Sequence, residues 1–476
     1  MLHISTRGGA PAINFTDTLL AGLARDGGLY VPQSWPTLSK ARIGELSGLS
    51  YAKAAETVIG ALVEDEVAQP VLKRAIDGAY GAFRHPSVCP LTQIGDNLFV
   101  LELFHGPTLA FKDVAMRLLA GLMDAALEAE ARRITIVGAT SGDTGSAAID
   151  AFAGSRRADV FILYPHERIS EVQRRQMTTS TAPNVHAIAI EGTFDDCQAL
   201  VKAMFNHHEF RDRLSLAGVN SINWARIVAQ VVYYFTSAVA LGAPHRPVSF
   251  AVPTGNFGNV LAGFVAKRMG LPISRLVVAT NDNDILSRAL ANGRYEKAGV
   301  VATASPSMDI EVSSNFERLL FEAHGRDAAA VQASMDSLAQ SGGFSIPAQV
   351  LGSIRAEFDG YRTTARDAAA TMRETWDEAH YLLDPHTAVA VHAAKRARKR
   401  DPAMPMIALA TAHPAKFPDA VQAATGVRPE LPAHLADLMA RKERVIVLRN
   451  DREAVEACIE KEARARASLA GLAGGG

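Results

Sequence analysis

The chain has 476 residues, with 49 Lys and Arg against 50 Asp and Glu, and 48% of its residues are hydrophobic. This length predicts about three domain-sized units, since one domain takes roughly 100–200 residues. The balanced charge gives no reason to expect a nucleic-acid partner, and it excludes an acidic disordered chain.

The cysteines and the apolar stretches indicate the compartment. Cys89, Cys197 and Cys458 lie far apart, so we expect neither a disulfide framework nor a metal site. Residues 1–9 contain no apolar segment of the signal-peptide type. The longest apolar stretch, 227–243, is interrupted by polar residues, and a membrane span needs about 20 apolar residues. We therefore expect a buried helix there and a cytoplasmic protein without a membrane partner.

The pattern of apolar residues predicts the elements in chain order. Residues 1–90 are expected to be mainly helical. From about residue 132 onward, short β-branched runs alternate with helical segments, and strands are predicted over 134–137, 160–164, 185–190, 248–252, 276–280 and 407–411. Near-continuous apolar strands separated by helices imply parallel sheets with helices on both faces. Residues 300–375 are typical of a helical insertion.

The segment 104–113 places Lys112 after the apolar residues 109–111. A lysine at the edge of an apolar run is most often a surface residue whose aliphatic part lies along apolar surface. The functional alternative is an amine held in partly apolar surroundings, which suits Schiff-base chemistry.

The segment 138–145 follows a predicted strand and precedes a helix. Thr140, Ser141 and Thr144 supply hydroxyl groups, and the helix N-terminus supplies N–H groups that suit an anion such as an α-carboxylate. Asp143 is the unusual member, because a carboxylate in an anion-binding turn costs energy. Helix capping is the alternative, but it needs one such side chain and the segment has four.

Two further loops combine groups that suit phosphate. Residues 220–226 include Asn220, Ser221 and Arg226, whose planar guanidinium suits a phosphate or carboxylate; a purely local pairing of Arg226 is equally compatible. In the second loop the strand over 248–252 leads into a turn of small and amide-bearing residues, Gly255, Asn256, Phe257, Gly258 and Asn259. Its glycines let backbone N–H groups approach a phosphate, although a plain strand-to-helix turn has similar composition. Neither GxGxxG nor GxxxxGK[ST] occurs at these loops, which argues against dinucleotide and triphosphate sites.

Thr411 stands at the carboxyl end of the predicted strand over 407–411. Loops that follow parallel strands meet at one edge of a sheet, where ligands bind. A lysine amine, a phosphate loop and a carboxylate loop at one edge would suit pyridoxal 5′-phosphate and an amino-acid substrate. Thr411 would then face the pyridine nitrogen with a neutral hydroxyl instead of a carboxylate.

Five motifs occur in the order HGPTLAFKD, GATSGDTG, NSINWAR, PTGNFGN and TAHPAKF. Together they resemble the threonine synthase family of fold-type II pyridoxal-phosphate enzymes, and residues 5–8, 26–31, 305–310 and 383–388 extend the resemblance. The length and the N-terminal portion resemble the longer branch of the family. This resemblance implies an α/β fold with two doubly wound domains of the tryptophan synthase β-like type, a mainly helical N-terminal domain and a helical insertion.

The implied domain division has four parts. Residues 1–95 would form the N-terminal domain, and residues 96–125 with 225–430 the large cofactor-binding domain, which includes the insertion at about 300–375. Residues 126–224 would form the small α/β domain, and residues 431–476 a C-terminal segment.

The resemblance also implies residue roles. Lys112 would form the Schiff base and move the substrate proton, residues 255–259 would bind the cofactor phosphate, and Thr411 would face the pyridine nitrogen. The hydroxyls of Thr140, Ser141 and Thr144 would bind the substrate carboxylate, whereas Asn220, Ser221 and Arg226 would bind the substrate phosphate.

Asp143 would lie at the O3′ edge of the cofactor, where the shorter branch of the family has Asn. An ionised Asp only accepts hydrogen bonds, whereas Asn also donates. Either the cofactor oxygen keeps a proton, or Asp143 serves elsewhere.

The implied activity is that of a carbon–oxygen lyase acting on phosphate. It would convert O-phospho-L-homoserine and water into L-threonine and phosphate, the last step of threonine biosynthesis, and family members occur as monomers and homodimers. A related phospho-lyase that releases a 2-oxo acid would use the same residues and stays open. The missing GxGxxG argues against a nucleotide-dependent oxidoreductase, and Lys112 together with every loop argues against an inactive paralogue.

Overall fold

The computed structural model describes residues 1–465. Their contacts divide the chain into two compact units, one formed by Met1–Leu118 with Ser221–Glu430 and the other by Leu119–Asn220 with the chain from Leu431 onward. Helix α5 (Lys112–Ala129) contains the first boundary. The finer four-part division stays a prediction.

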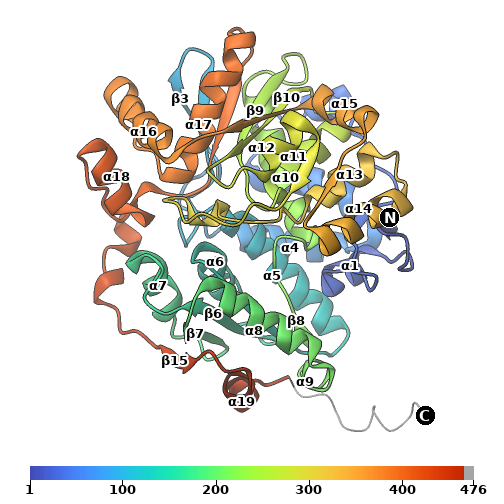
Figure 1. The fold of residues 1–476 in the computed structure, drawn as a ribbon, viewed down its shortest axis with the longest axis vertical. Helices are drawn as coiled ribbons and strands as arrows, with labels where there is room; N and C mark the ends of the chain where they lie inside the picture. Colours follow the sequence, from blue (N-terminus) through green and yellow to red (C-terminus); the bar gives the residue numbers. More distant parts are fainter. Residues whose placement is uncertain (466–476) are drawn as a thin grey trace. The chain divides into compact units, whose positions relative to one another are not determined.

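The first unit is built on a six-stranded sheet in the order β13-β10-β9-β14-β4-β3. From one edge to the other these strands are β13 (Phe358–Arg362), β10 (Ile273–Thr280), β9 (Val248–Pro253), β14 (Met406–Ala410), β4 (Leu98–Glu102) and β3 (Leu91–Gly95). All neighbours are parallel except β3, which pairs antiparallel with β4. The predicted parallel strands are therefore confirmed in this unit (Figure 1).

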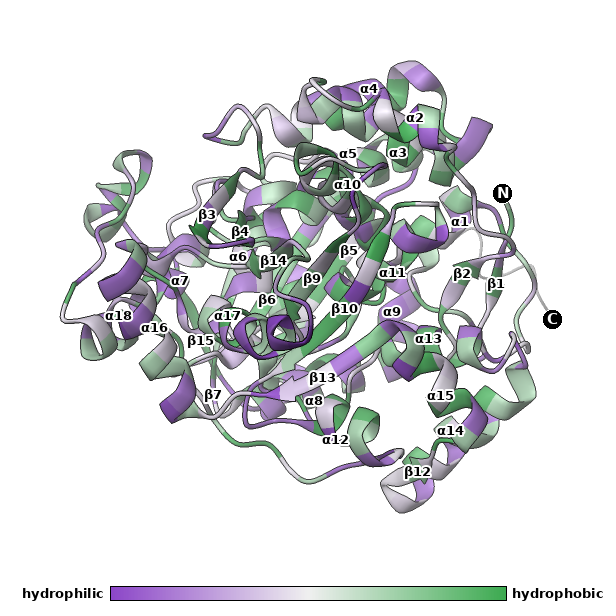
Figure 2. Ribbon diagram, turned by 90° about the horizontal axis from the view of Figure 1, so that it is seen from above, coloured by the Kyte–Doolittle hydropathy of each residue, from purple (hydrophilic) through white to green (hydrophobic). Residues whose placement is uncertain are grey.

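Helices cover both faces of this sheet, so its central strands β9 and β14 are buried along their whole length. Val277 and Ala279 of β10 belong to one apolar cluster with α17 (Pro385–Ala397). Leu276, which points to the opposite face, lies against Gly263 of α11 (Gly258–Arg268). Figure 2 shows β9 and β10 in hydrophobic colours, whereas β13 at the edge is more hydrophilic.

The remaining helices of the first unit surround this sheet. They are α1 (Phe15–Ala21), α2 (Lys40–Gly44), α3 (Tyr51–Val63), α4 (Gln69–Tyr80), α10 (Trp224–Ala240), α12 (Ile285–Asn292), α13 (Phe316–Ala323), α14 (Ala328–Ser341), α15 (Ala348–Glu357), α16 (Ala365–Ala379) and α18 (Pro418–Thr425). The unit also contains two short antiparallel pairs of strands. In one, β1 (His3–Ser5) pairs with β2 (Tyr30–Pro32), and in the other, β11 (Arg294–Glu296) pairs with β12 (Gly343–Ser345).

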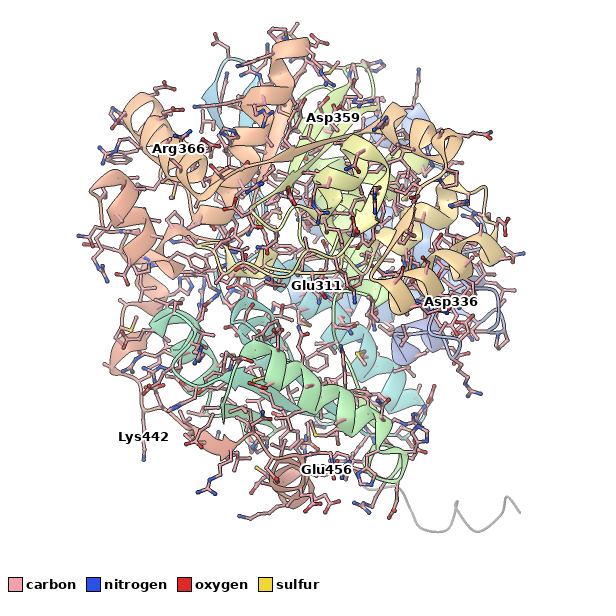
Figure 3. The ribbon with its side chains drawn as sticks, viewed as in Figure 1. Glu311, Asp336, Asp359, Arg366, Lys442 and Glu456 are labelled. Atoms are coloured by element: carbon pink, nitrogen blue, oxygen red, sulfur yellow. The ribbon has the colours of Figure 1, made fainter. Side chains whose placement is uncertain are left out.

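The segment expected as a helical insertion is mostly helical but also contains β13. Its sequence, FDGYR, has no apolar run, so the pattern did not indicate a strand. Asp359, which is labelled in Figure 3, instead accepts hydrogen bonds. The donors are the guanidinium groups of Arg275 on β10 and of Arg400. These charge-assisted bonds stabilise a strand that pairs on one side only.

Helix α10 confirms the buried helix expected from the apolar stretch. Nearly all of its residues are buried, and the side chain of Asn223 caps its N-terminus by accepting from the N–H of Ala225 at 3.0 Å. Within residues 1–465, no helix is both long and apolar enough to cross a bilayer.

The second unit contains a five-stranded parallel sheet in the order β15-β7-β6-β5-β8. Its strands are β5 (Ile134–Ala139), β6 (Ala158–Pro165), β7 (Val185–Glu191), β8 (Leu216–Ala217) and β15 (Ile446–Arg449). Its helices are α6 (Asp143–Phe152), α7 (Glu171–Thr178), α8 (Phe194–Asn206), α9 (His208–Arg213) and α19 (Arg452–Glu462). Residues after Leu431 complete this unit, because Val455 and Ile459 of α19 join its apolar core. Glu456 of α19, labelled in Figure 3, also contacts His207 of the same unit at 3.0 Å.

Candidate active site

Lys112 begins helix α5 and is 7% exposed. The turn before it is held by Asp113, whose carboxylate accepts from the Thr108 N–H at 2.8 Å and from the Thr108 hydroxyl at 2.5 Å. A Cβ on Gly106 would lie 2.4 Å from an oxygen of Asp113, so only glycine fits there. These contacts fix the direction in which the Lys112 side chain leaves the helix.

The residues after β14 hold the same turn from the other side. The N–H of Phe111 donates to the Thr411 carbonyl at 2.8 Å, and the fully buried Lys416 amine donates to the Thr108 carbonyl at 2.8 Å. The motif TAHPAKF thus has a structural role beside that expected for Thr411, which is 5% exposed. Because β14 ends at Ala410, Thr411 is the first residue beyond the strand.

The loop 255–259 joins β9 to α11, and it has the features of an anion site. Phe257 lies in the left-handed region with φ 63°, and no side chain caps the N-terminus of α11. Within residues 1–465, the backbone N–H groups of residues 256–259 have no acceptor. Free N–H groups and the helix dipole both favour a phosphate at this position.

Asn259 adds a buried donor to this loop. Its side-chain oxygen accepts from the hydroxyls of Tyr233 at 2.5 Å and Tyr234 at 3.1 Å. Its amide nitrogen is buried and has no hydrogen-bond partner within residues 1–465. A buried N–H group without an acceptor is costly unless a ligand satisfies it, and a phosphate oxygen would do so.

The segment 305–318 holds the loop 255–259 in place, a role that no motif in the sequence predicted. The Ser313 hydroxyl donates to the Gly255 carbonyl at 2.6 Å. The side-chain amide of Asn315 donates to the Asn256 carbonyl at 2.9 Å and to the Ser221 carbonyl at 3.2 Å. Asn315 therefore joins the loop 255–259 to the loop that precedes α10.

Ser307 connects this segment to Lys112. The Lys112 amine donates to the Ser307 hydroxyl at 3.2 Å. A Cβ on Gly255 would lie 3.0 Å from the Ser307 carbonyl oxygen, so the backbones at Gly255 and Ser307 are packed together. Ser307 alone thus lies between the Lys112 amine and the loop 255–259.

Arg226 lies in the first turn of α10 and is 3% exposed. Burial lowers the pKa of its guanidinium to about 10, while Tyr233 acts in the opposite direction. Burying a cation costs free energy, and a bound phosphate would offset part of that cost. Ser221, on the same loop, is half-buried, whereas Asn220 is exposed and belongs to the second unit.

In the second unit, the loop after β5 presents another helix N-terminus. Gly142 has φ 134° and is the N-cap residue of α6, where as a glycine it offers no side chain to the helix N–H groups. The Thr140 hydroxyl oxygen accepts from the N–H groups of Gly142 and Gly145, both at 2.9 Å, and so shapes the loop internally. Within the described residues, neither the hydroxyls nor the N–H groups of Ser141 and Thr144 have a partner. These two residues are therefore available to an anion.

Asp143 is 2% exposed, and Gln173 of α7 donates to its carboxylate at 2.8 Å. A Cβ on Gly142 would lie only 2.3 Å from the amide carbon of Gln173, so the Gln173 side chain packs directly against this glycine. Ser170 fixes Gln173 in turn through a capping box. No pattern in the sequence indicates Gln173, because only the fold brings α7 to this loop.

The comparisons with known proteins match almost the whole chain. Residues 2–80 match the family described as "Threonine synthase N terminus", residues 90–411 match "Pyridoxal-phosphate dependent enzyme", and residues 387–459 match "Threonine synthase, C-terminal". A threonine synthase of Pseudomonas aeruginosa is 52% identical over 462 residues, which cover 97% of this chain and 98% of that protein. The chain belongs to the threonine synthase family.

Two solved structures agree. The pyridoxal-phosphate-bound threonine synthase of Brucella melitensis has a TM-score of 0.96 and 60% identity, and covers 98% of this chain and 100% of its own. The yeast threonine synthase has a TM-score of 0.92 and 41% identity, and covers 97% of this chain and 98% of its own. The fold-type II architecture and the family expected from the sequence are thus confirmed.

The chain is accordingly a pyridoxal-phosphate-dependent lyase of the threonine synthase family. The first unit fits this cofactor, because it combines Lys112 with two kinds of donor that have no acceptor within residues 1–465. These are the backbone N–H groups of the loop 255–259 and the side-chain amide nitrogen of Asn259. Among residues 1–465, no group of His, Cys, Asp and Glu side chains could hold a metal ion.

The loop 255–259 supplies a testable prediction. A Cβ at Gly255 would lie 3.0 Å from the Ser307 oxygen and 3.2 Å from Met308 Cα, so Gly255→Ala must displace the segment that contacts Lys112. If overpacking costs about 1–3 kcal/mol, we expect the affinity for pyridoxal phosphate to fall about 5- to 150-fold. Titration of the apoprotein with the cofactor measures this.

Gly78→Ala is the matched control, since a Cβ at Gly78 within α4 meets nothing within 4 Å. It should leave the cofactor affinity unchanged. Equal affinities for the Gly255→Ala variant and the wild type would contradict the placement of the phosphate.

Proposed function

We propose that this protein converts O-phospho-L-homoserine and water into L-threonine and phosphate. The observation that carries the proposal is the contact of Ser307 with both the Lys112 amine and the backbone at Gly255. It puts a nucleophilic amine beside an anion-binding helix N-terminus within one unit, and this is the arrangement that a phosphorylated aldehyde cofactor requires.

In this proposal the first unit binds the cofactor and the substrate phosphate. Lys112 is the amine that attaches the cofactor, residues 255–259 hold its phosphate, and Thr411 faces its pyridine nitrogen. Ser221 and Arg226 bind the substrate phosphate. The contact of Asn315 with both loops supports this, since it holds the loop before α10 beside the cofactor loop.

The second unit supplies the carboxylate site in the same proposal. Ser141 and Thr144 bind the substrate α-carboxylate through their hydroxyl and N–H groups, which have no partner in the described chain. Thr140 keeps the loop in shape through its two accepted bonds. Asn220 is assigned to the substrate phosphate by resemblance alone.

The cofactor, when bound, supplies an electron sink for negative charge at the substrate Cα. Lys112 removes the Cα proton and becomes an ammonium group. Phosphate leaves from Cγ with its bridging oxygen as Cβ loses a proton, and Cγ then gains a proton, so these two transfers balance. Water adds its oxygen to Cβ and gives a proton to the released phosphate, and Lys112 returns its own proton to Cα. Arg226 keeps the released phosphate in place. The second pKa of phosphate is about 6, so the phosphate can act as the base for the attacking water.

The origin of the oxygen atoms tests this sequence of steps. In water labelled with heavy oxygen, the label should enter the threonine hydroxyl, while all four phosphate oxygens come from the substrate, because the broken bond is Cγ–O. Label in the phosphate would show P–O cleavage and would refute the proposal. A phospho-lyase is not favoured by the Pseudomonas aeruginosa, Brucella melitensis and yeast relatives, which are named threonine synthases.

We propose that Asp143 lies at the O3′ edge of the cofactor as an acceptor that Gln173 orients. Asp143→Asn then replaces an acceptor with a possible donor at that oxygen, so the absorbance maximum of the loaded protein should shift, and turnover should fall by about tenfold to a hundredfold. Spectra and steady-state rates measure both effects.

Asp195→Asn is the matched control, an exposed acid in the first turn of α8. It should change neither quantity. A wild-type spectrum for Asp143→Asn would place Asp143 away from the cofactor.

We further propose a cytoplasmic location and a monomeric or homodimeric state. The three cysteines support a reducing compartment, since Cys89, Cys197 and Cys458 are all free. Sedimentation of the loaded protein would distinguish monomer from dimer.

A further inference from the structure

Two segments that contain none of the catalytic or binding residues assigned above meet close to Lys112. These segments are 305–309, which includes Ser307, and 384–387 at the start of α17. The Ser307 backbone N–H donates to His386 Nε2 at 3.3 Å, and His386 Nδ1 lies 2.7 Å from the Asp384 carboxylate. With the bond from the Lys112 amine to the Ser307 hydroxyl, this forms a continuous series of contacts within the first unit.

The tautomer of His386 follows from these contacts. A backbone N–H only donates, so Nε2 must accept and carries no proton. The proton of the neutral ring therefore resides on Nδ1, which donates it to Asp384. An imidazolium would direct a second N–H at the Ser307 N–H and lose this bond.

The Asp384 carboxylate is held by hydrogen bonds other than the one to the His386 ring. It is 1% exposed and caps α17 by accepting from the N–H groups of His386 at 2.9 Å and Thr387 at 3.0 Å, and it also accepts from the Thr387 hydroxyl. His386 is 3% exposed, and its ring packs against Phe417 with centroids 5.0 Å apart. The imidazole therefore has one orientation.

Ser307 is also held from its other side. Asp309, two residues later, accepts from the side chains of Asn281 at 2.7 Å and Asn283 at 2.9 Å. The Ser307 hydroxyl is thus presented to Lys112 by a segment that is fixed at both ends.

We propose that Ser307 is a catalytic residue whose hydroxyl holds the Lys112 amine, and that His386 and Asp384 are positioning residues that fix Ser307. The inference rests on the proposed role of Lys112. When Lys112 removes the Cα proton it becomes an ammonium group with three N–H donors, one of which the Ser307 oxygen accepts. The proton then returns from the ammonium group to Cα. No net proton leaves the site.

The test uses the full-length apoprotein and the loaded enzyme with Ser307→Ala and Ser307→Thr. Pyridoxal phosphate is added to each apoprotein, and the growth of the Schiff-base absorbance is followed. Acylation of Lys112 by an amine-reactive reagent is measured in parallel by peptide mass spectrometry. A misplaced amine should slow both reactions about tenfold in Ser307→Ala and lower kcat about 10- to 100-fold, with KM nearly unchanged. Ser307→Thr keeps the hydroxyl and should restore most of each rate.

The positioning residues are tested by His386→Gln and His386→Leu. Gln retains an acceptor near the Nε2 position and should remain close to wild type, whereas Leu should reproduce the slow Lys112 reactions of Ser307→Ala. Ser353→Ala, an exposed serine of α15, is the control and should change nothing.

Wild-type rates of Schiff-base formation and of Lys112 acylation in Ser307→Ala would overturn the inference, even if kcat fell. Lys112→Ala separates this from the proposed function. If Lys112→Ala lacks the absorbance while Ser307→Ala forms it at the wild-type rate, only the inference fails; if Lys112→Ala keeps the absorbance, the proposed function fails too.

Discussion

Lys112→Ala is expected to abolish turnover and the Schiff-base absorbance of the cofactor-loaded protein. The variant lacks the amine that attaches the cofactor and moves the Cα proton, so we expect a loss of at least about a thousandfold in kcat. The fold should persist, because the turn before α5 is held by Asp113 and by Lys416, not by the Lys112 amine. Absorbance spectra, steady-state rates and circular dichroism measure the three quantities.

Lys112→Arg is the matched control for charge. It keeps a cation at the same position but cannot form the Schiff base or act as a neutral base near pH 7. We expect it to be as inactive as Lys112→Ala. If either variant retained both the absorbance and the rate, Lys112 would not be the cofactor-binding lysine.

Arg226→Ala is expected to produce the second large effect. The proposed phosphate contact would be lost in a buried site, so kcat/KM for O-phospho-L-homoserine should fall about 100- to 1,000-fold, which corresponds to about 3–4 kcal/mol. An unphosphorylated analogue that lacks this contact should bind with nearly unchanged affinity. Cofactor absorbance should also remain.

Two comparisons make the Arg226 experiment decisive. Arg226→Lys keeps the charge without the planar fork and should retain intermediate activity. Arg294→Ala removes an exposed guanidinium and should have no effect. Equal losses for the phosphorylated and unphosphorylated compounds would contradict the assignment of Arg226 to the substrate phosphate.

The sequence predicted the elements whose pattern is local. Strands β5, β6, β7, β9, β10 and β14 carry continuous apolar runs, and the structure confirms them with changes of a few residues at their ends. Strand β13 was missed because its sequence, FDGYR, is polar and its pairing depends on Arg275 and Arg400. A strand defined by partners distant in sequence leaves no periodic signal.

The candidate site shows the same limit. Lys112, Arg226 and the loop 255–259 could be identified because residue type and spacing indicate their chemistry. Ser307 and Asn315 could not, because their role lies in contacts across long separations, such as the 195 residues between Lys112 and Ser307. Motifs around residues 305–310 and 383–388 contributed only to the resemblance, and the structure shows what they contact.

Thr140 illustrates a different limit. Its hydroxyl suits a substrate carboxylate by type, but the structure shows that its oxygen already accepts two backbone N–H groups. Ser141 and Thr144, in the same loop, have no such partners in the described chain. Composition alone does not separate a residue that shapes a loop from one that binds through it.

A product assay tests the central claim most directly. The purified protein, loaded with pyridoxal phosphate, is incubated with O-phospho-L-homoserine, and amino acids, oxo acids and phosphate are quantified together by mass spectrometry. We predict threonine and phosphate in a ratio of one to one. Phosphate accompanied by 2-oxobutyrate and little threonine would contradict the proposed function and make this chain a phospho-lyase.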